Sequence, residues 1–420
     1  MTPGDEHVHY LRLANGIDLA VLPTGRRSVT AIEMRFLGGY AYERPDRLGV
    51  AHILAETMTK GTQRRDGRAL NDAFDEIGTS YAVSAARETF VISCVCLPEF
   101  VAQAVELLAE MINEPSFPGE ACEVAVELAR QSLAALEDDP LELAKKCLCQ
   151  QAYSPPLNRH VYGEPATVER IGREDVVEHW RTYLKPDRLL VSVAGAVDPS
   201  AVADLFERLF PATGLNDPVV NASLPLSFPL GFRPGQSHRQ KDLEQEQIGV
   251  CFPGASAVDE DEAVERVIIG LLSGGMSSRL WQSIREKQGL VYWVGAWFDR
   301  PRTGGMIHLG SSCTPQNLEA TSEMLLKEVN RLADDVTESE VQRAISGILA
   351  SAQTHGDVTR AKATRIVNDL FYLGRPIPLE EKLSRIRAVT IGDVRQYLRR
   401  HPREQLSIVT VGPRCLKDFR

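Results

Sequence analysis

The sequence lacks long apolar runs and an excess of positive charge. No stretch of about 18 consecutive apolar residues occurs, so a membrane-spanning helix is not predicted, and residues 1–30 contain no apolar signal core. The formal net charge is −10, whereas a nucleic-acid-binding protein needs a basic surface. We therefore expect a soluble, cytoplasmic protein with no nucleic-acid partner and no membrane span. A leader peptide removed before residue 1 stays open as an alternative for its location.

Several signatures of catalysis and ligand binding are also missing. The eight cysteines include no C-x-x-C pair, which favours reduced structural thiols over a zinc ribbon. No G-x-S-x-G motif accompanies the nine histidines, so a Ser-His-Asp hydrolase is not predicted. The glycines after Ser273 are not followed by Gly-Lys-Ser at P-loop spacing, which argues against nucleotide binding.

Composition and length indicate a globular protein of more than one domain. Hydrophobic residues make up 43% and charged residues 25% of the chain, and its 420 residues are too many for one ordinary core. In the first half, Asn15-Gly16 separates two alternating runs and predicts a β-hairpin over residues 7–22. Further strands are expected at 29–38 and 80–97, with helices at 49–59 and 119–136.

A change in amino-acid composition separates the two halves of the sequence. Residues 211–240 contain five prolines and three glycines and little periodicity, which is typical of a linker. The order of elements then repeats, with strands early, paired helices in the middle and a strand late. The last helix is expected at 378–398. The sequence therefore predicts an α+β fold of two similar domains, each an antiparallel-rich sheet with packed helices, at 1–215 and 244–420, with a linker at 216–243.

One short helix in the first half carries a recognisable pattern. In residues 49–62, apolar positions recur at helical spacing, and His52 and Glu56 would lie one above the other and could share a ligand. The stretch resembles the zinc helix of the pitrilysin/insulinase family, which includes the mitochondrial processing peptidases and has the motif H-x-x-E-H. In this register the first His is His52, but the general-base Glu is Ala55 and the second His is Glu56.

The resemblance also shows what else is missing from a zinc site. It places the third ligand, a Glu in the family, at Ser132, and a supporting Glu at Ala125. A catalytic zinc needs three protein ligands and a base for its bound water. An alternative is a weak metal site of His52 and Glu56 completed by Glu127 or a partner. Even there Ala55 could not accept a proton, so we expect no zinc in this chain and no peptidase activity of the chain alone.

A second motif of the family is altered in the same half. The family's substrate-binding edge strand has the pattern Gly-Gly-x-x-Asn-Ala-x-Thr, which corresponds to residues 78–85. The Asn position is Ala82, so the polar group that would orient a scissile peptide is missing. An exposed edge strand could still add a peptide by main-chain pairing.

The second half keeps a family motif unchanged. The pattern Arg-x-x-x-Gly-Leu-x-Tyr supplies an arginine and a tyrosine that bind substrate beside the zinc, and it matches Arg285 and Tyr292. An arginine can donate two hydrogen bonds to a carbonyl or carboxylate, and a tyrosine hydroxyl can stabilise developing charge. Without the resemblance, the two would be interpreted as a surface arginine and a half-buried aromatic ring.

The resemblance runs from about residue 7 to Gly412 and implies a function. Some family enzymes are heterodimers in which one subunit carries the zinc motif and the other keeps only the Arg/Tyr pair. The leading hypothesis is such a non-catalytic, substrate-binding subunit of a clamshell-forming zinc metalloendopeptidase that acts on extended peptides. Its expected partner is a homologous subunit that holds the zinc, and a homodimer is an alternative state of the isolated chain. The other hypotheses are a structural or assembly subunit and a peptidase with a reworked metal site.

Overall fold

The computed structural model describes residues 7–25, 29–211, 227–356, 358–401 and 405–417. The chain folds into two compact units, neither of which is contiguous in sequence. Unit 1 consists of the described residues of Met1–Ala134, Arg159–Leu226 and His355–Pro378. Unit 2 consists of the described residues of Ala135–Asn158, Ser227–Thr354 and Leu379–Arg420.

Unit 1 is built on a six-stranded sheet with the order β1-β2-β6-β3-β5-β4. Its strands are β1 (His9–Arg12), β2 (Asp18–Pro23), β3 (Thr30–Leu37), β4 (Ser80–Ala85), β5 (Thr89–Cys96) and β6 (Leu189–Gly195). All neighbours pair antiparallel except β2 and β6. The predicted hairpin is confirmed as β1 and β2, and Gly16 in its turn has a φ of 92°, a value that glycine adopts without strain.

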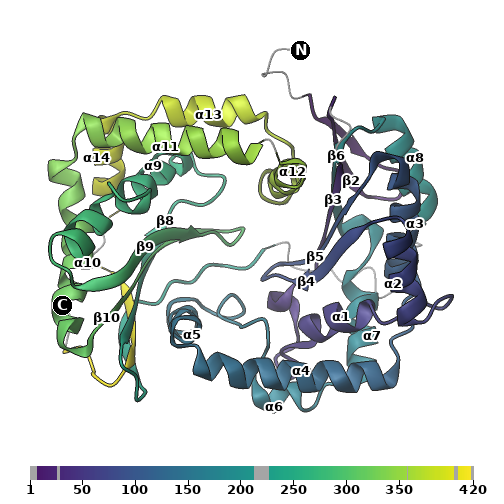
Figure 1. The fold of residues 1–420 in the computed structure, drawn as a ribbon, viewed down its shortest axis with the longest axis horizontal. Coiled ribbons are helices and arrows are strands. Elements are labelled where there is room, and N and C mark those ends of the chain that lie inside the picture. Colours follow the sequence, from purple (N-terminus) through teal and green to yellow (C-terminus); the bar gives the residue numbers. More distant parts are fainter. Residues whose placement is uncertain (1–6, 26–28, 212–226, 357, 402–404, 418–420) are drawn as a thin grey trace. The chain divides into compact units, whose positions relative to one another are not determined.

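Helices cover both faces of this sheet (Figure 1). The helices of unit 1 are α1 (Val50–Met58), α2 (Gly67–Glu76), α3 (Val101–Asn113), most of α4 (Gly119–Asp138), α6 (Pro165–Val168), α7 (Arg173–Tyr183), α8 (Pro199–Leu209) and α12 (Thr359–Leu373). On one face, Ile32, Met34 and Phe36 of β3 enter the main core with side chains of α1 and α3. Alternate residues of a strand point to opposite faces, so the remaining β3 side chains meet a different layer.

That second layer is α12, which comes from the C-terminal part of the sequence. Its Ala363, Ile366 and Leu370 pack against small residues of β2, β3 and β6, including Ala31. The Ser192 hydroxyl donates to the Ala363 carbonyl oxygen at 2.6 Å. Because both faces of the central strands are covered, β2 and β6 read as almost continuous apolar runs rather than alternating ones.

Unit 2 contains a five-stranded sheet with the order β7-β11-β8-β10-β9. Its strands are β7 (Gly235–Gln240), β8 (Glu246–Gly254), β9 (Val291–Asp299), β10 (Gly305–Cys313) and β11 (Ser407–Gly412). Its helices are α5 (Pro140–Ala152), α9 (Glu262–Ser273), α10 (Leu318–Asp335), α11 (Glu338–Gly356), α13 (Leu379–Arg387), α14 (Ile391–Arg400) and the π-helix η4 (Trp281–Glu286). Helix α5, from the N-terminal part of the sequence, packs on β8 and β11.

The α+β class predicted from the sequence is confirmed, with two units that each combine one sheet with packed helices. Two local expectations were wrong. Residues 235–240 of the expected linker form β7, which pairs parallel with β11, whereas residues 216–226 lie outside the described part of the chain. The helix expected at 378–398 is two helices, because the Thr390 hydroxyl accepts from the Asp393 backbone N–H and caps α14.

Among the described residues, no helix is both long enough and apolar enough to cross a membrane.

Candidate functional site

A buried carboxylate fixes the start of α1, the helix that carries His52. The helix follows Gly49, whose φ of 103° favours glycine, and the Glu43 carboxylate accepts from the backbone N–H groups of Gly49 at 2.9 Å and Ala51 at 2.8 Å. Burial raises the pKa of Glu43 to about 8, although these two hydrogen bonds and Arg159 oppose the shift. Arg159 also donates to the carbonyl oxygens of Ala41 and Glu43. The helix is thus held at its N-terminus in one position.

His52 and Glu56 lie on this helix as expected, both half-buried. The His52 ring meets the Tyr162 ring edge-on, with 4.9 Å between centroids. Burial lowers the pKa of His52, and the nearby charge of Glu56 opposes this, so the imidazole is neutral near pH 7. A neutral imidazole is a competent metal ligand. The pair therefore supplies two adjacent donors and no more.

The other positions of the zinc motif hold no donor that completes a site. Ala55 is only 3% exposed and its methyl belongs to the main core of unit 1. Ser132 on α4 is half-buried, and Ala125 is part of the same core. Glu127 accepts from Arg130 at 3.0 Å and from Gln131 at 3.2 Å. The described residues contain no group of three or more His, Cys, Asp or Glu side chains that could hold a metal, so these side chains do not fit a catalytic zinc.

The strand with the altered asparagine position lies at an edge of the unit 1 sheet. Among the described strands, β4 pairs only with β5, with Ala82 opposite Ser93. Tyr81, Val83 and Ala85 turn toward the core, whereas Ala82 is exposed on the other face. The exposed face of the strand thus presents a methyl group where the family has an amide.

Arg285 and Tyr292 are brought together in unit 2. Arg285 lies in η4, and Tyr292, at the start of the edge strand β9, is 78% exposed. The guanidinium carbon lies over the Tyr292 ring, 5.2 Å from its centroid, and over the Trp281 ring at 3.9 Å. Both distances are within the range of cation–π interactions. Single-turn π-helices are frequent at functional sites, because the extra residue reorients the side chains.

An ion-pair cluster attaches the segment before η4 to the neighbouring helices. The buried Arg279 donates to both carboxylate oxygens of Glu340, at 2.8 and 2.9 Å, and also pairs with Asp335. Although burial opposes it, hydrogen bonds from Arg279 and from Thr337 hold the pKa of Glu340 at about 2. The π-helix that carries Arg285 therefore starts from a fixed residue.

Sequence reasoning missed three parts of these sites: Glu43, Arg279 and Trp281. Arg279 acts through Glu340, a residue distant in sequence, which no local pattern records. Glu43 binds backbone N–H groups of Gly49 and Ala51 across a turn that has no helix or strand period. Trp281 lies four residues before Arg285, a spacing that places two side chains together on a helix, and this signal could have been used.

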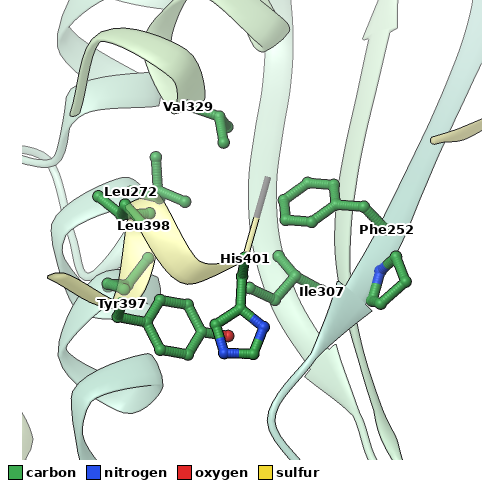
Figure 2. A pocket seen from close by; sticks show the side chains of 9 residues that line it. Phe252, Leu272, Ile307, Val329, Tyr397, Leu398 and His401 are labelled. Atoms are coloured by element: carbon green, nitrogen blue, oxygen red, sulfur yellow. The ribbon is translucent and has the colours of Figure 1, made fainter. Parts of the chain in front are cut away.

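A small cavity inside unit 2 offers no alternative site. Figure 2 shows it between the α9 and α14 side chains and the sheet, lined by Phe252, Leu272, Ile307 and Leu398, with the His401 ring stacked on Tyr397. Its volume is about 10 Å³, room for at most one water molecule. The lining is almost entirely apolar, so the cavity is a packing gap in the core.

Two family models match adjoining parts of the chain. The one described as "Insulinase (Peptidase family M16)" matches residues 23–164, and the one described as "Peptidase M16 inactive domain" matches residues 170–348. Together they span both units and include His52, Ser132, Arg285 and Tyr292.

Relatives of similar length agree with this match. An "Uncharacterized zinc protease" of Rickettsia bellii is 26% identical, covering 99% of this chain and 100% of the relative. The "Probable mitochondrial-processing peptidase subunit beta" of Arabidopsis thaliana is 25% identical, covering 96% of this chain and 77% of the relative. The "Non-peptidase homolog YmxG" of Helicobacter pylori is 24% identical, covering 88% and 85%.

Solved structures have the same fold. A peptidase M16 inactive domain from Pseudomonas fluorescens aligns with a TM-score of 0.88 and 18% identity, covering 98% of this chain and 99% of that one. A chain of Complex III2 from Candida albicans aligns with a TM-score of 0.82 and 17% identity, covering 97% and 96%. The sequence models, the full-length relatives and the fold agree, and the chain belongs to the M16 family of peptidases, the insulinase or pitrilysin family.

Proposed function

We propose that this chain is the non-catalytic, peptide-binding subunit of a heterodimeric zinc endopeptidase. A homologous partner with an intact H-x-x-E-H motif holds the zinc, and Arg285 and Tyr292 of this chain act in the partner's active site. The observation that carries the proposal is the contrast between two sites of one molecule: the described zinc positions lack a third ligand and a base, whereas the Arg285–Tyr292 pair is present and accessible.

The chemistry of the zinc positions argues against catalysis by the chain alone. Hydrolysis by a zinc enzyme needs a base that takes a proton from the metal-bound water. At the base position, Ala55 offers a buried methyl group. General-base catalysis typically contributes about 10²–10⁴-fold to the rate, and the carboxylate next to Ala55 on α1, that of Glu56, takes the position of the second metal ligand rather than that of the base.

The Arg285–Tyr292 pair supports a role in binding. Tyr292 exposes its ring and hydroxyl, and the Arg285 guanidinium lies over that ring. A guanidinium and a phenol in this arrangement can bind a peptide carbonyl or carboxylate and stabilise negative charge as it develops on the oxygen. In the partner's site, this would position the peptide for attack by the zinc-bound water.

The relatives favour a divided enzyme. The Arabidopsis thaliana relative is named as a subunit of a processing peptidase, and that of Helicobacter pylori is named a non-peptidase homologue. A family with both names is expected when one copy keeps the catalytic residues and another keeps only binding residues. In this proposal the isolated chain binds peptides weakly and can pair with a second copy of itself.

The test uses the complex of this chain with a homologue that carries the intact zinc motif. Cleavage of a fluorogenic peptide is measured with Arg285→Ala and Tyr292→Phe in this chain, with Arg343→Ala as control, since Arg343 is an exposed arginine of unit 2 that donates to Ser339 one turn earlier. We expect kcat/KM to fall about 10- to 10²-fold for Arg285→Ala, because a charge-assisted hydrogen bond to the peptide typically contributes about 1.5–3 kcal/mol, and to stay unchanged for Arg343→Ala. Full activity of both site variants would refute the proposal.

A structural or assembly subunit is the second candidate, favoured by the name of the Helicobacter pylori relative. It predicts no activating partner. It also predicts that Arg285→Ala changes no activity and at most the thermal stability of the chain.

A further inference from the structure

We propose that Trp281, Arg285 and Tyr292 form a carboxylate-binding site, in which Trp281 is a positioning residue for the Arg285 guanidinium. The inference rests on the proposed function and narrows it, because it assigns Arg285 to an anionic group of the bound peptide rather than to a neutral carbonyl. It also adds a residue that no family motif supplied.

The Arg285 guanidinium lies against two aromatic rings. Its carbon lies 3.9 Å from the Trp281 ring centroid and 5.2 Å from that of Tyr292. Aromatic rings contact a guanidinium through its flat face, so the N–H donors at its edge remain available. Within the described residues, no carboxylate lies within ion-pair distance of Arg285 and no acceptor receives its N–H groups.

Arg285 differs in its ion pairing from most of the other described arginines of unit 2. Most of them form an ion pair with a carboxylate, namely Arg239, Arg266, Arg279, Arg300, Arg331, Arg385, Arg387, Arg400 and Arg414. Arg285 is half-buried and keeps its charge uncompensated. A planar guanidinium matches a carboxylate with two parallel hydrogen bonds, whereas a single carbonyl oxygen leaves its charge unneutralised.

A hydrogen bond to Glu286 holds the Trp281 side chain. Its indole N–H donates to a carboxylate oxygen of Glu286 at 3.1 Å. In a π-helix the backbone bonds run from residue i to i+5, so both Arg285 and Glu286 lie about one turn after Trp281. The same indole therefore contacts the Arg285 guanidinium and donates to the carboxylate of Glu286, the next residue in the chain.

Tyr292 completes the site on the solvent side. Its side chain is 78% exposed, so a ligand can reach the hydroxyl and the edge of the guanidinium together. A carboxylate held by both would receive three donors, two from the guanidinium and one from the phenol.

The experiment measures ligand binding by NMR on the full chain labelled with ¹⁵N-arginine. The Arg285 Nε–H signal is identified as the one lost in Arg285→Lys. Acetate and acetamide, which have nearly the same shape but differ in charge, are titrated separately. We expect acetate to shift this signal in a saturable way and acetamide to shift it little. Equal responses to both probes would overturn the carboxylate assignment.

Variants of Trp281 test its positioning role. Trp281→Ala is expected to weaken acetate binding about fivefold or more, and Trp281→Phe, which keeps an aromatic face without the indole N–H, to restore part of the loss. Trp297→Phe is the control, because Trp297 lies on β9 but stacks on His308. The thermal melting temperature of each variant is recorded. Unchanged acetate affinity in a folded Trp281→Ala variant would refute the role of Trp281.

Three short acetylated peptides identify the source of the carboxylate: one with a free C-terminus, its C-terminal amide, and that amide with one internal glutamate. Preference for the first assigns a peptide C-terminus, and preference for the third assigns an acidic side chain. No preference over the neutral amide overturns the inference. If Arg285→Ala lowers cleavage by the complex but the chain binds acetate no better than acetamide, only this inference is refuted. If the chain binds acetate better than acetamide but Arg285→Ala leaves cleavage unchanged, the proposed function is refuted instead.

Discussion

Residue 55 shows at the scale of one side chain how a helix can keep its buried face while the position of the family's general base holds an alanine. The alanine methyl packs into the core beside Ile53 and Leu54, and α1 still begins at Gly49 under the cap from Glu43. The shape of the helix depends on its buried face and its cap, whereas zinc chemistry depends on the few side chains that were replaced. Stability of α1 and catalysis by α1 are therefore separable.

Glu43 gives a prediction of pH dependence. Burial raises its pKa in the folded state to about 8, above its ordinary value of 4.5, so the folded protein holds a proton that the unfolded chain releases between these values. Its contribution to stability is therefore fully present below pH 4.5 and is lost as pH rises through about 8, by at most about 1.4 kcal/mol per pH unit.

The measurement is urea unfolding of the wild type and Glu43→Gln at pH 5 and pH 8, with the exposed Glu178→Gln as control. We expect the wild type to lose more stability than Glu43→Gln between the two pH values. Parallel losses in all three proteins would show that Glu43 does not titrate in this range.

At the scale of elements, the placement of η4 depends on the Arg279 cluster. Arg279 is 7% exposed and binds Glu340 and Asp335. We expect Arg279→Ala to lower the free energy of unfolding by about 1.5–3 kcal/mol, because the partly exposed Glu340 loses the charge-assisted hydrogen bonds from Arg279. Chemical denaturation measures the loss, and Arg266→Ala serves as control for a more exposed ion pair within one helix. A loss equal to that of the control would contradict the role of Arg279.

Some of these elements could be predicted from the sequence and others could not. The Asn15-Gly16 hairpin, α1 and the edge strand β4 follow from local patterns, because turn chemistry and periodicity act over a few residues. β7 was missed because Gly235–Gln240 is almost wholly exposed and shows no alternation. Its pairing with β11 depends on a strand about 170 residues later, which local pattern cannot indicate. The contact of Trp281 with Arg285 was within reach of helical spacing, but the π-helix was not.

At the scale of the whole molecule, each unit includes a helix from a distant part of the sequence: α12 belongs to unit 1 and α5 to unit 2. Helix α12 covers the face of the unit 1 sheet that includes Ala20, Ala31 and Ala194. A fragment of residues 1–215, the N-terminal domain expected from the sequence, would leave this apolar face open to water. We therefore expect the fragment alone to lack a cooperative thermal transition by circular dichroism, and a peptide of residues 355–378 to restore one. A fragment that melts cooperatively without the peptide would contradict this prediction.

We propose that this chain holds no catalytic zinc and depends on a partner that does. The most direct measurement is the zinc content per chain, determined by elemental analysis of protein purified alone without added metal, and then of the complex with the intact homologue. We expect well below one zinc in the isolated chain and one zinc per heterodimer. One firmly bound zinc in the isolated chain, lost on His52→Ala, would contradict it and would make the chain a metalloenzyme in its own right.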